Sequence, residues 1–131
     1  MRNAVHHIEL WTQDLPGSAA AFGWILSELG WHADHDPSWP QGRTWRHAGG
    51  VYLVLEQSPD VTGGHDRHRA GLNHLALRAG SRALLDRIRD HCAEWGWVEL
   101  FPEHYPHAGG AQHTALYLEN GEGFEIEIVV D

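Results

Sequence analysis

An internal duplication governs how this chain of 131 residues can fold. A short apolar stretch with a histidine at residues 5–11 recurs at residues 72–78, and a helical stretch follows each copy. Both helical stretches end in nearly the same tetrapeptide, Glu28-Leu29-Gly30-Trp31 in the first half and Glu94-Trp95-Gly96-Trp97 in the second. A glycine just beyond the last helical turn is a common way to end a helix. The repetition predicts two copies of one small unit.

The histidine of each copy lies on the polar face of a predicted strand. Successive side chains of a strand point to opposite faces, so alternation shows which residues share a face. In the first copy His7, Glu9 and Trp11 oppose His6, Ile8 and Leu10. In the second copy Leu72, His74, Ala76 and Arg78 oppose Asn73, Leu75 and Leu77. His7 and His74 therefore occupy matching positions in the two units.

Helix signals and turn residues mark the rest of each unit. In the first half Asp14 can cap a helix that has Pro16 in its first turn and Gly30 at its end. In the second half Ser81 and Gly96 take the capping and terminating positions. Three strands are expected after each helix, at residues 31–35, 43–47 and 51–56 in the first half and at 97–101, 113–118 and 124–130 in the second.

Residues 57–71 carry Pro, Gly and charged residues without an apolar period, which is typical of a linker. We therefore predict a single domain of 1–131 with two βαβββ modules, one at about 4–56 and one at about 72–130. Each module would be a small sheet with a helix on one face. The fold class that follows is α+β.

Composition limits the classes of partner and the compartment. The formal charge of −9 argues against a nucleic-acid partner. The single cysteine, Cys92, excludes an internal disulfide, fits a reducing compartment and is expected to pack in the core. No apolar run reaches the roughly 18 residues of a membrane span, and no signal-peptide pattern opens the chain. We expect a soluble cytoplasmic protein.

Ionisable side chains gather on one face of four predicted strands, whereas the opposite faces are aliphatic. Such groups are costly inside a protein unless they are hydrated, paired or bound to metal. Two histidines and two or three carboxylates that converge on a cavity would form a mixed N/O site for a divalent transition metal. The residues on the ionisable face are His7 and Glu9, Tyr52 and Glu56, His74 and Arg78, and Glu125 and Glu127.

Over its whole length the chain resembles the vicinal oxygen chelate superfamily, which includes glyoxalase I, extradiol dioxygenases, fosfomycin-resistance enzymes and bleomycin-type resistance proteins. The C-terminal part is similar to the family pattern Y-F-E-D-P-D-G-x-x-L-E-V, although Asn120-Gly121-Glu122-Gly123 replaces Asp-Pro-Asp-Gly. The other matching residues are His7-Ile8-Glu9-Leu10, Asp14-Leu15, Ser18, Phe22, Leu29-Gly30 and Asn73-His74-Leu75-Ala76-Leu77.

The resemblance implies a cupped mixed β-sheet with the helices on the outside and a metal held inside. His7, His74 and Glu127 would be metal ligands, and Glu56 a fourth ligand or a general base. Glu125 is the alternative to Glu127 if the register is shifted by two residues. The metal (Fe, Ni, Zn or Mn) would bind a small-molecule substrate through two neighbouring oxygens, as in a lyase or isomerase of glyoxalase or resistance type.

Two other functions remain open on the resemblance. An extradiol ring-cleaving dioxygenase needs only two histidines and one carboxylate around Fe(II). A metal-free binding protein would sequester an aromatic antibiotic between tryptophans. We expect a homodimer, with the modules paired within one chain or swapped between two.

Several further polar residues lie outside the expected set of metal ligands. Glu9 and Arg78 form either an ion pair at the cavity or two solvated charges at its rim. The histidines of the second long loop, His104, His107 and His113, are expected at the surface.

Overall fold

The computed structural model describes residues 4–131, which form two compact units divided after Gly64. Each unit contains a four-stranded mixed sheet and one principal helix in the order βαβββ. The predicted α+β class and the duplicated unit are therefore confirmed. The exact limits of the predicted modules and linker remain a prediction.

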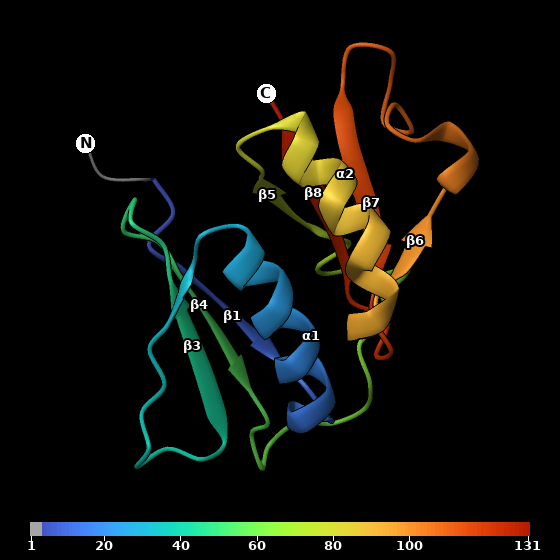
Figure 1. The fold of residues 1–131 in the computed structure, drawn as a ribbon. Helices are drawn as coiled ribbons and strands as arrows, with labels where there is room; N and C mark the ends of the chain where they lie inside the picture. Colours follow the sequence, from blue (N-terminus) through green and yellow to red (C-terminus); the bar gives the residue numbers. More distant parts are fainter. Residues whose placement is uncertain (1–3) are drawn as a thin grey trace. The chain divides into compact units, whose positions relative to one another are not determined.

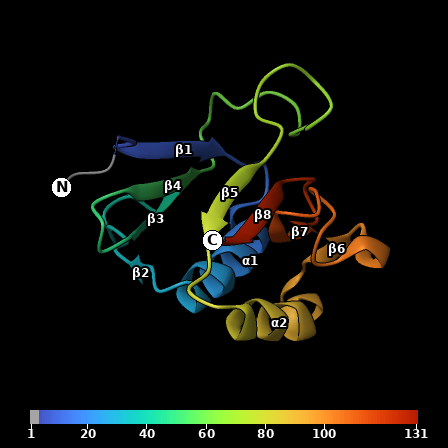
Figure 2. The same ribbon diagram turned by 90° about the horizontal axis from the view of Figure 1, so that it is seen from above.

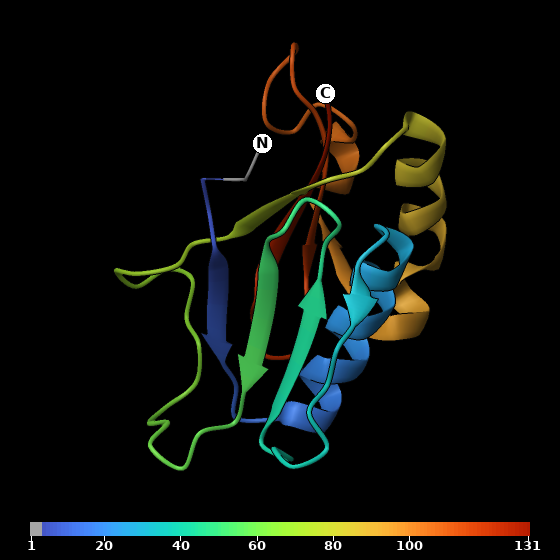
Figure 3. The ribbon, with the colours of Figure 1, turned by 90° about the vertical axis from the view of Figure 1, so that its left-hand side faces the viewer.

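The first unit is built on the sheet order β1-β4-β3-β2. Strand β1 is parallel to β4, and the other neighbours are antiparallel. Helix α1 packs on this sheet, which Figure 3 shows nearly face-on. The elements are β1 (His7–Trp11), α1 (Leu15–Glu28), β2 (His32–Ala33), β3 (Gly42–Arg46) and β4 (Tyr52–Glu56). Figure 1 labels all of them except β2, which is labelled in Figure 2.

The second unit repeats this topology with the order β5-β8-β7-β6. Strand β5 is parallel to β8, and α2 packs on β7 and β8 (Figure 2). Two short 3₁₀ turns, η1 and η2, flank β6. The elements are β5 (Leu75–Arg78), α2 (Arg82–His91), η1 (Cys92–Trp95), β6 (Val98–Leu100), η2 (Pro102–His104), β7 (Thr114–Glu119) and β8 (Glu125–Val130).

The helix signals act as the sequence predicts. The Asp14 carboxylate accepts a hydrogen bond from the Gly17 amide, and the Ser81 hydroxyl accepts one from the Leu84 amide. Gly30 and Gly96 adopt left-handed φ angles of 86° and 87°, which glycine reaches without steric cost. The second helix differs in one respect, because its last turn tightens into η1 before Gly96.

Strand β5 begins later than the alternation predicts. Its pairing with β8 starts at Leu75, which lies opposite Ile126, whereas the expected strand opened at Leu72. Residues 72–74 form an irregular segment in which the Asn73 side chain bonds to the backbone of Arg67. Local side-chain bonding of this kind competes with strand pairing. His74 consequently lies just before the strand.

Each unit has its own aliphatic core between helix and sheet. Leu10, Leu53 and Leu55 are buried in the first unit, and Leu77, Ile126 and Ile128 in the second. Cys92 belongs to the second core, as expected, and its thiol donates to the Arg89 carbonyl. Within residues 4–131 no helix has the length and apolar character needed to cross a membrane.

Candidate metal centre

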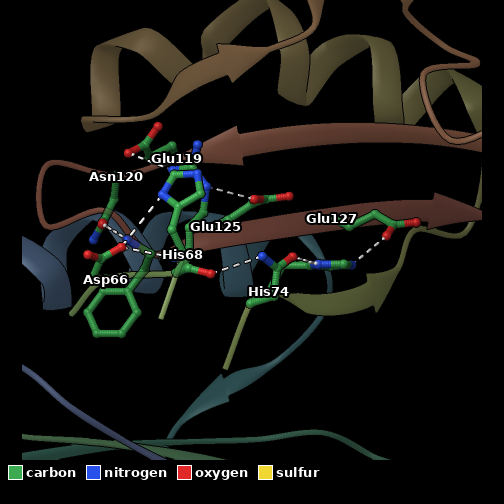
Figure 4. A network of polar contacts seen from close by, with 10 residues as sticks. Asp66, His68, His74, Glu119, Asn120, Glu125 and Glu127 are labelled. Carbon is green, nitrogen blue, oxygen red and sulfur yellow. Dashed lines mark hydrogen bonds and ion pairs between the residues drawn. The ribbon is translucent and has the colours of Figure 1, made fainter. Parts of the chain in front are cut away.

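The most concentrated group of ionisable side chains surrounds Glu127 on strand β8. Its side chain is only 8% exposed, and its two oxygens have different histidine partners. Nε2 of His74 lies 3.0 Å from Oε1, and Nε2 of His113 hydrogen bonds with Oε2. Figure 4 shows the ring of His74 directed at Glu127. We call His74, His113, Tyr117 and Glu127 the Glu127 cluster.

Tyr117 is the fourth member of the Glu127 cluster. It lies directly opposite Glu127 in the β7–β8 ladder, and the two side chains hydrogen bond. Burial raises the pKa of the Tyr117 phenol, and the charge of Glu127 raises it further. The phenol therefore stays protonated at neutral pH and donates its hydrogen to the carboxylate.

His113 is the member that the sequence prediction missed. We expected it at the surface with His104 and His107, and its ring is indeed 41% exposed. Its Nε2 nevertheless meets the buried carboxylate of Glu127. Alternation along the predicted strand at 113–118 already places His113 and Tyr117 on one face, and this indicated the contact. The histidine-rich loop obscured that signal.

The loop before His113 packs closely against the cluster. Nδ1 of His107 lies 3.2 Å from the carbonyl oxygen of His113, and the Ala115 amide donates to the Pro106 carbonyl. A Cβ atom at Gly109 would lie 2.4 Å from the Tyr117 hydroxyl oxygen and 2.7 Å from a ring carbon of His113. Only glycine allows this approach.

Glu125 has a different environment from Glu127, although both side chains point to the same face of the sheet. Its Oε1 lies 3.0 Å from Nε of Arg67, and an Nη atom of the same guanidinium lies 2.8 Å from Glu119. The Arg67 side chain is only 17% exposed. Glu125 thus belongs to an ion-pair network in which Arg67 contacts both strands of the β7–β8 hairpin.

In the first unit, His7 and Glu56 lie on the same face of the sheet. His7 stacks on Tyr52 with ring centroids 4.7 Å apart, and its Nδ1 lies 2.8 Å from Nδ1 of His6. His6, which alternation places on the opposite face, is therefore in contact with the predicted ligand His7. Burial raises the pKa of Glu56, and a hydrogen bond with Glu9 and the charge of Glu9 raise it further.

Glu9 and Arg78 each have a partner within their own unit. The Glu9 carboxylate accepts a hydrogen bond from the Trp11 indole, 2.6 Å away. Nε of Arg78 lies 3.1 Å from Asp131, and the Arg78 side chain is 81% exposed. The solvated-charge alternative fits Arg78.

The four predicted ligands are thus divided between the units. His74 and Glu127 are in direct contact in the second unit, and His7 and Glu56 share a sheet face in the first. Nothing in these contacts tests whether they bind metal, and their roles remain predictions.

The Glu127 cluster contains donor atoms of the types that bind transition metals. Imidazole nitrogen and carboxylate oxygen are the donors expected for Mn, Fe, Ni or Zn. In the arrangement described, these donors bond to one another. Among residues 4–131 no group of three or more His, Cys, Asp or Glu side chains is positioned to hold a metal ion. Binding would therefore exchange the imidazole–carboxylate hydrogen bonds for metal bonds.

Comparison with known proteins defines the class. No family model matches the sequence. The chain is 35% identical over 127 residues to the uncharacterised protein YqjT of Bacillus subtilis (strain 168), which covers 95% of this chain and 97% of that protein. The crystal structure of a candidate glyoxalase from Bacillus halodurans is 35% identical, with a TM-score of 0.89 over 98% of this chain and 96% of that one.

A more distant solved structure shares the fold alone. It is a variant of the fosfomycin resistance protein FosX from Listeria monocytogenes, complexed with Mn(II). Its identity to this chain is 14% and its TM-score 0.65, over 98% of this chain and 90% of that one. The chain belongs to the vicinal oxygen chelate superfamily, as its paired βαβββ units and these relatives show.

Proposed function

We propose that this protein is a divalent-metal-dependent enzyme that acts on a small molecule with two neighbouring oxygen atoms. The observation that carries the proposal is the carboxylate of Glu127, buried between the imidazoles of His74 and His113. A nearly buried carboxylate is costly to keep charged without such partners. Two imidazoles and one carboxylate are also a common donor set for transition metals.

The proposed ligands are His7, His74 and Glu127, with Glu56 as a fourth ligand or a base. The structure adds His113 as a neighbour of Glu127 that can donate a further nitrogen. The contacts favour Glu127 over Glu125, since Arg67 already pairs with Glu125. A fold relative, the Listeria FosX variant, is complexed with Mn(II). When bound, a divalent metal would polarise the substrate oxygens as a Lewis acid.

Side chains of this protein can bind and transfer the proton that such a reaction moves. Burial raises the pKa of Glu56, and its hydrogen bond with Glu9 and the charge of Glu9 raise it further. A carboxylate with a pKa nearer neutrality is better matched to general acid–base work. Tyr117 remains a neutral donor beside Glu127. We therefore propose proton transfer by Glu56, as in a lyase or isomerase, with orientation by Tyr117.

The test is elemental analysis of protein purified without an affinity tag. We expect about one equivalent of Fe, Ni, Zn or Mn per chain in the wild type, and a large loss in both His74→Ala and Glu127→Gln. Unchanged metal content in both variants would refute the assignment of the site. A wild type that neither contains nor takes up metal would favour the binding-protein alternative.

A further inference from the structure

The side-chain amide of Asn73 has a fixed partner at each end. Its Nδ2 donates to the backbone carbonyl of Arg67, 3.1 Å away. Its Oδ1 lies 2.7 Å from Nδ1 of His74, on the side of the ring away from Glu127. Asn73 therefore bridges the irregular segment before β5 and the histidine of the Glu127 cluster.

The contacts of Asn73 call for a hydrogen on Nδ1 of His74. A backbone carbonyl can only accept, so the NH₂ group of Asn73 must face Arg67 and its oxygen must face His74. An amide oxygen also only accepts, so Nδ1 of His74 must donate. Nε2 faces Glu127, 3.0 Å away, and it becomes available to a metal when its hydrogen bond with the carboxylate is exchanged for a metal bond.

Glu127 by itself would favour the opposite arrangement. A carboxylate next to Nε2 attracts a proton to that nitrogen, and a neutral imidazole has only one N–H to place. Without Asn73, the His74 ring would donate from Nε2 to Glu127. That tautomer has no lone pair on the nitrogen that faces Glu127. The acceptor on the other side of the ring is thus needed to free Nε2.

Asn73 is held in this orientation because Arg67 is anchored. The Arg67 guanidinium lies 2.8 Å from Glu119 and 3.0 Å from Glu125, whose side chain is only 9% exposed. Figure 4 shows these two carboxylates beside the loop that carries Asp66 and His68. The loop is closed on itself, because the Arg69 amide donates to the Asp66 carbonyl. The Arg67 carbonyl is therefore a fixed acceptor.

We propose that Asn73 is a positioning residue that keeps hydrogen on Nδ1 of His74 and leaves Nε2 as the donor atom for a metal. Arg67 acts one step further out, by fixing the amide of Asn73. Partners of this kind typically change metal affinity by about 10- to 100-fold. The metal-binding part rests on the proposed function, whereas the effect on the ring hydrogen does not.

The first measurement concerns the ring itself. Protein with ¹⁵N-labelled histidine is examined without metal by long-range ¹H–¹⁵N correlation at about pH 8, above the ordinary histidine pKa of about 6.5. We expect Nδ1 of His74 to be protonated in the wild type and in Asn73→Asp, whose carboxylate still accepts. In Asn73→Ala we expect Nδ1 to lose its hydrogen, because the remaining acceptor, Glu127, faces Nε2. An unprotonated Nδ1 in the wild type, or no change in Asn73→Ala, would overturn the proposal.

The second measurement is the affinity for Mn(II), the weakest of the divalent ions in the usual order and so the least prone to bind stray histidines. We expect Asn73→Ala to bind about 10- to 100-fold more weakly and Asn73→Asp to recover most of the loss. His68→Ala, which removes an exposed histidine of the same loop, should match the wild type. Equal affinity in Asn73→Ala and wild type would contradict the proposal.

The two measurements separate this proposal from the proposed function. If the wild type binds no Mn(II) but Nδ1 responds to Asn73→Ala, the metal function fails and the positioning role stands. If the wild type binds Mn(II) and Nδ1 does not respond, the positioning role fails alone. A cooperative thermal transition in each variant shows that the unit is folded, and Asn73→Asp provides the test should Asn73→Ala not fold.

Discussion

Nε2 of His74 lies 3.0 Å from Oε1 of Glu127, although the two residues are separated by 53 positions in the chain. The parallel pairing of β5 with β8 creates this contact, because it sets Ala76 opposite Glu127 and holds the segment before β5 beside the carboxylate. A second histidine, His113, reaches the other oxygen from the residue just before the antiparallel neighbour β7. One buried carboxylate thus contacts the ring of a histidine that directly precedes each adjoining strand.

Substituting Gln for Glu127 or for Glu125, one at a time, should separate the effect on metal binding from the effect on stability. Glu127→Gln should weaken Mn(II) binding by more than about 100-fold, beyond the effect typical of an outer partner. Glu125→Gln should leave affinity nearly unchanged but lower the free energy of unfolding by about 1–3 kcal/mol, because Arg67 loses a buried partner. Calorimetric titration and chemical denaturation measure the two effects. A larger loss of affinity in Glu125→Gln would place the ligand two residues earlier.

Gly109 should be intolerant of even one added carbon. In Gly109→Ala the new Cβ would meet the Tyr117 hydroxyl oxygen at 2.4 Å, so Tyr117 and His113 must move. We expect a loss of stability of about 1–3 kcal/mol, as for overpacking elsewhere, and weaker Mn(II) binding. Gly121→Ala is the matched control, since nothing lies within 4 Å of a Cβ there. If the two variants behave alike, the loop does not support the cluster.

Much of this arrangement could be predicted from the sequence, and the exceptions have physical causes. The repeated strand–helix pattern identified His7 and His74 as equivalent, and the caps Asp14 and Ser81 act as predicted. His113 was missed because its contact depends on how the hairpin pairs in space. The late start of β5 was missed because Asn73 bonds to Arg67, a contact that no periodicity in the sequence records.

The Glu56 carboxyl should make stability depend on pH. Burial and Glu9 raise its pKa above the ordinary 4.5, so the folded state binds more protons than the unfolded state just above that pH. The stability that this proton contributes is present below pH 4.5 and is lost as pH rises through the raised pKa. In protein without metal, the melting temperature should therefore fall less in Glu56→Gln than in wild type as pH rises from 4.5 through the raised pKa of Glu56.

A matched control keeps the pH measurement specific to Glu56. Glu103→Gln removes a carboxylate that is 65% exposed and should follow the wild-type curve. Identical curves for wild type and Glu56→Gln would mean that Glu56 titrates normally. Its proposed role in proton transfer would then lose its support.

Tyr117→Phe should separate the role of the Tyr117 hydroxyl from that of its aromatic ring. The aromatic packing remains, and one hydrogen bond to Glu127 is lost. We expect a loss of stability of about 0.5–1.5 kcal/mol and retained metal binding. Once a substrate is known, turnover should fall more than Mn(II) affinity. The reverse order would make Tyr117 part of the metal site instead of a substrate-orienting donor.

The central claim is that His74 and Glu127 bind a functional divalent metal, and elemental analysis of untagged protein tests it most directly. The wild type should contain about one equivalent of a single transition metal per chain, or take up one equivalent of Mn(II). Both His74→Ala and Glu127→Gln should lose this metal while they keep a cooperative thermal transition. Stoichiometric metal in both variants, or none in the wild type under either condition, would contradict the account.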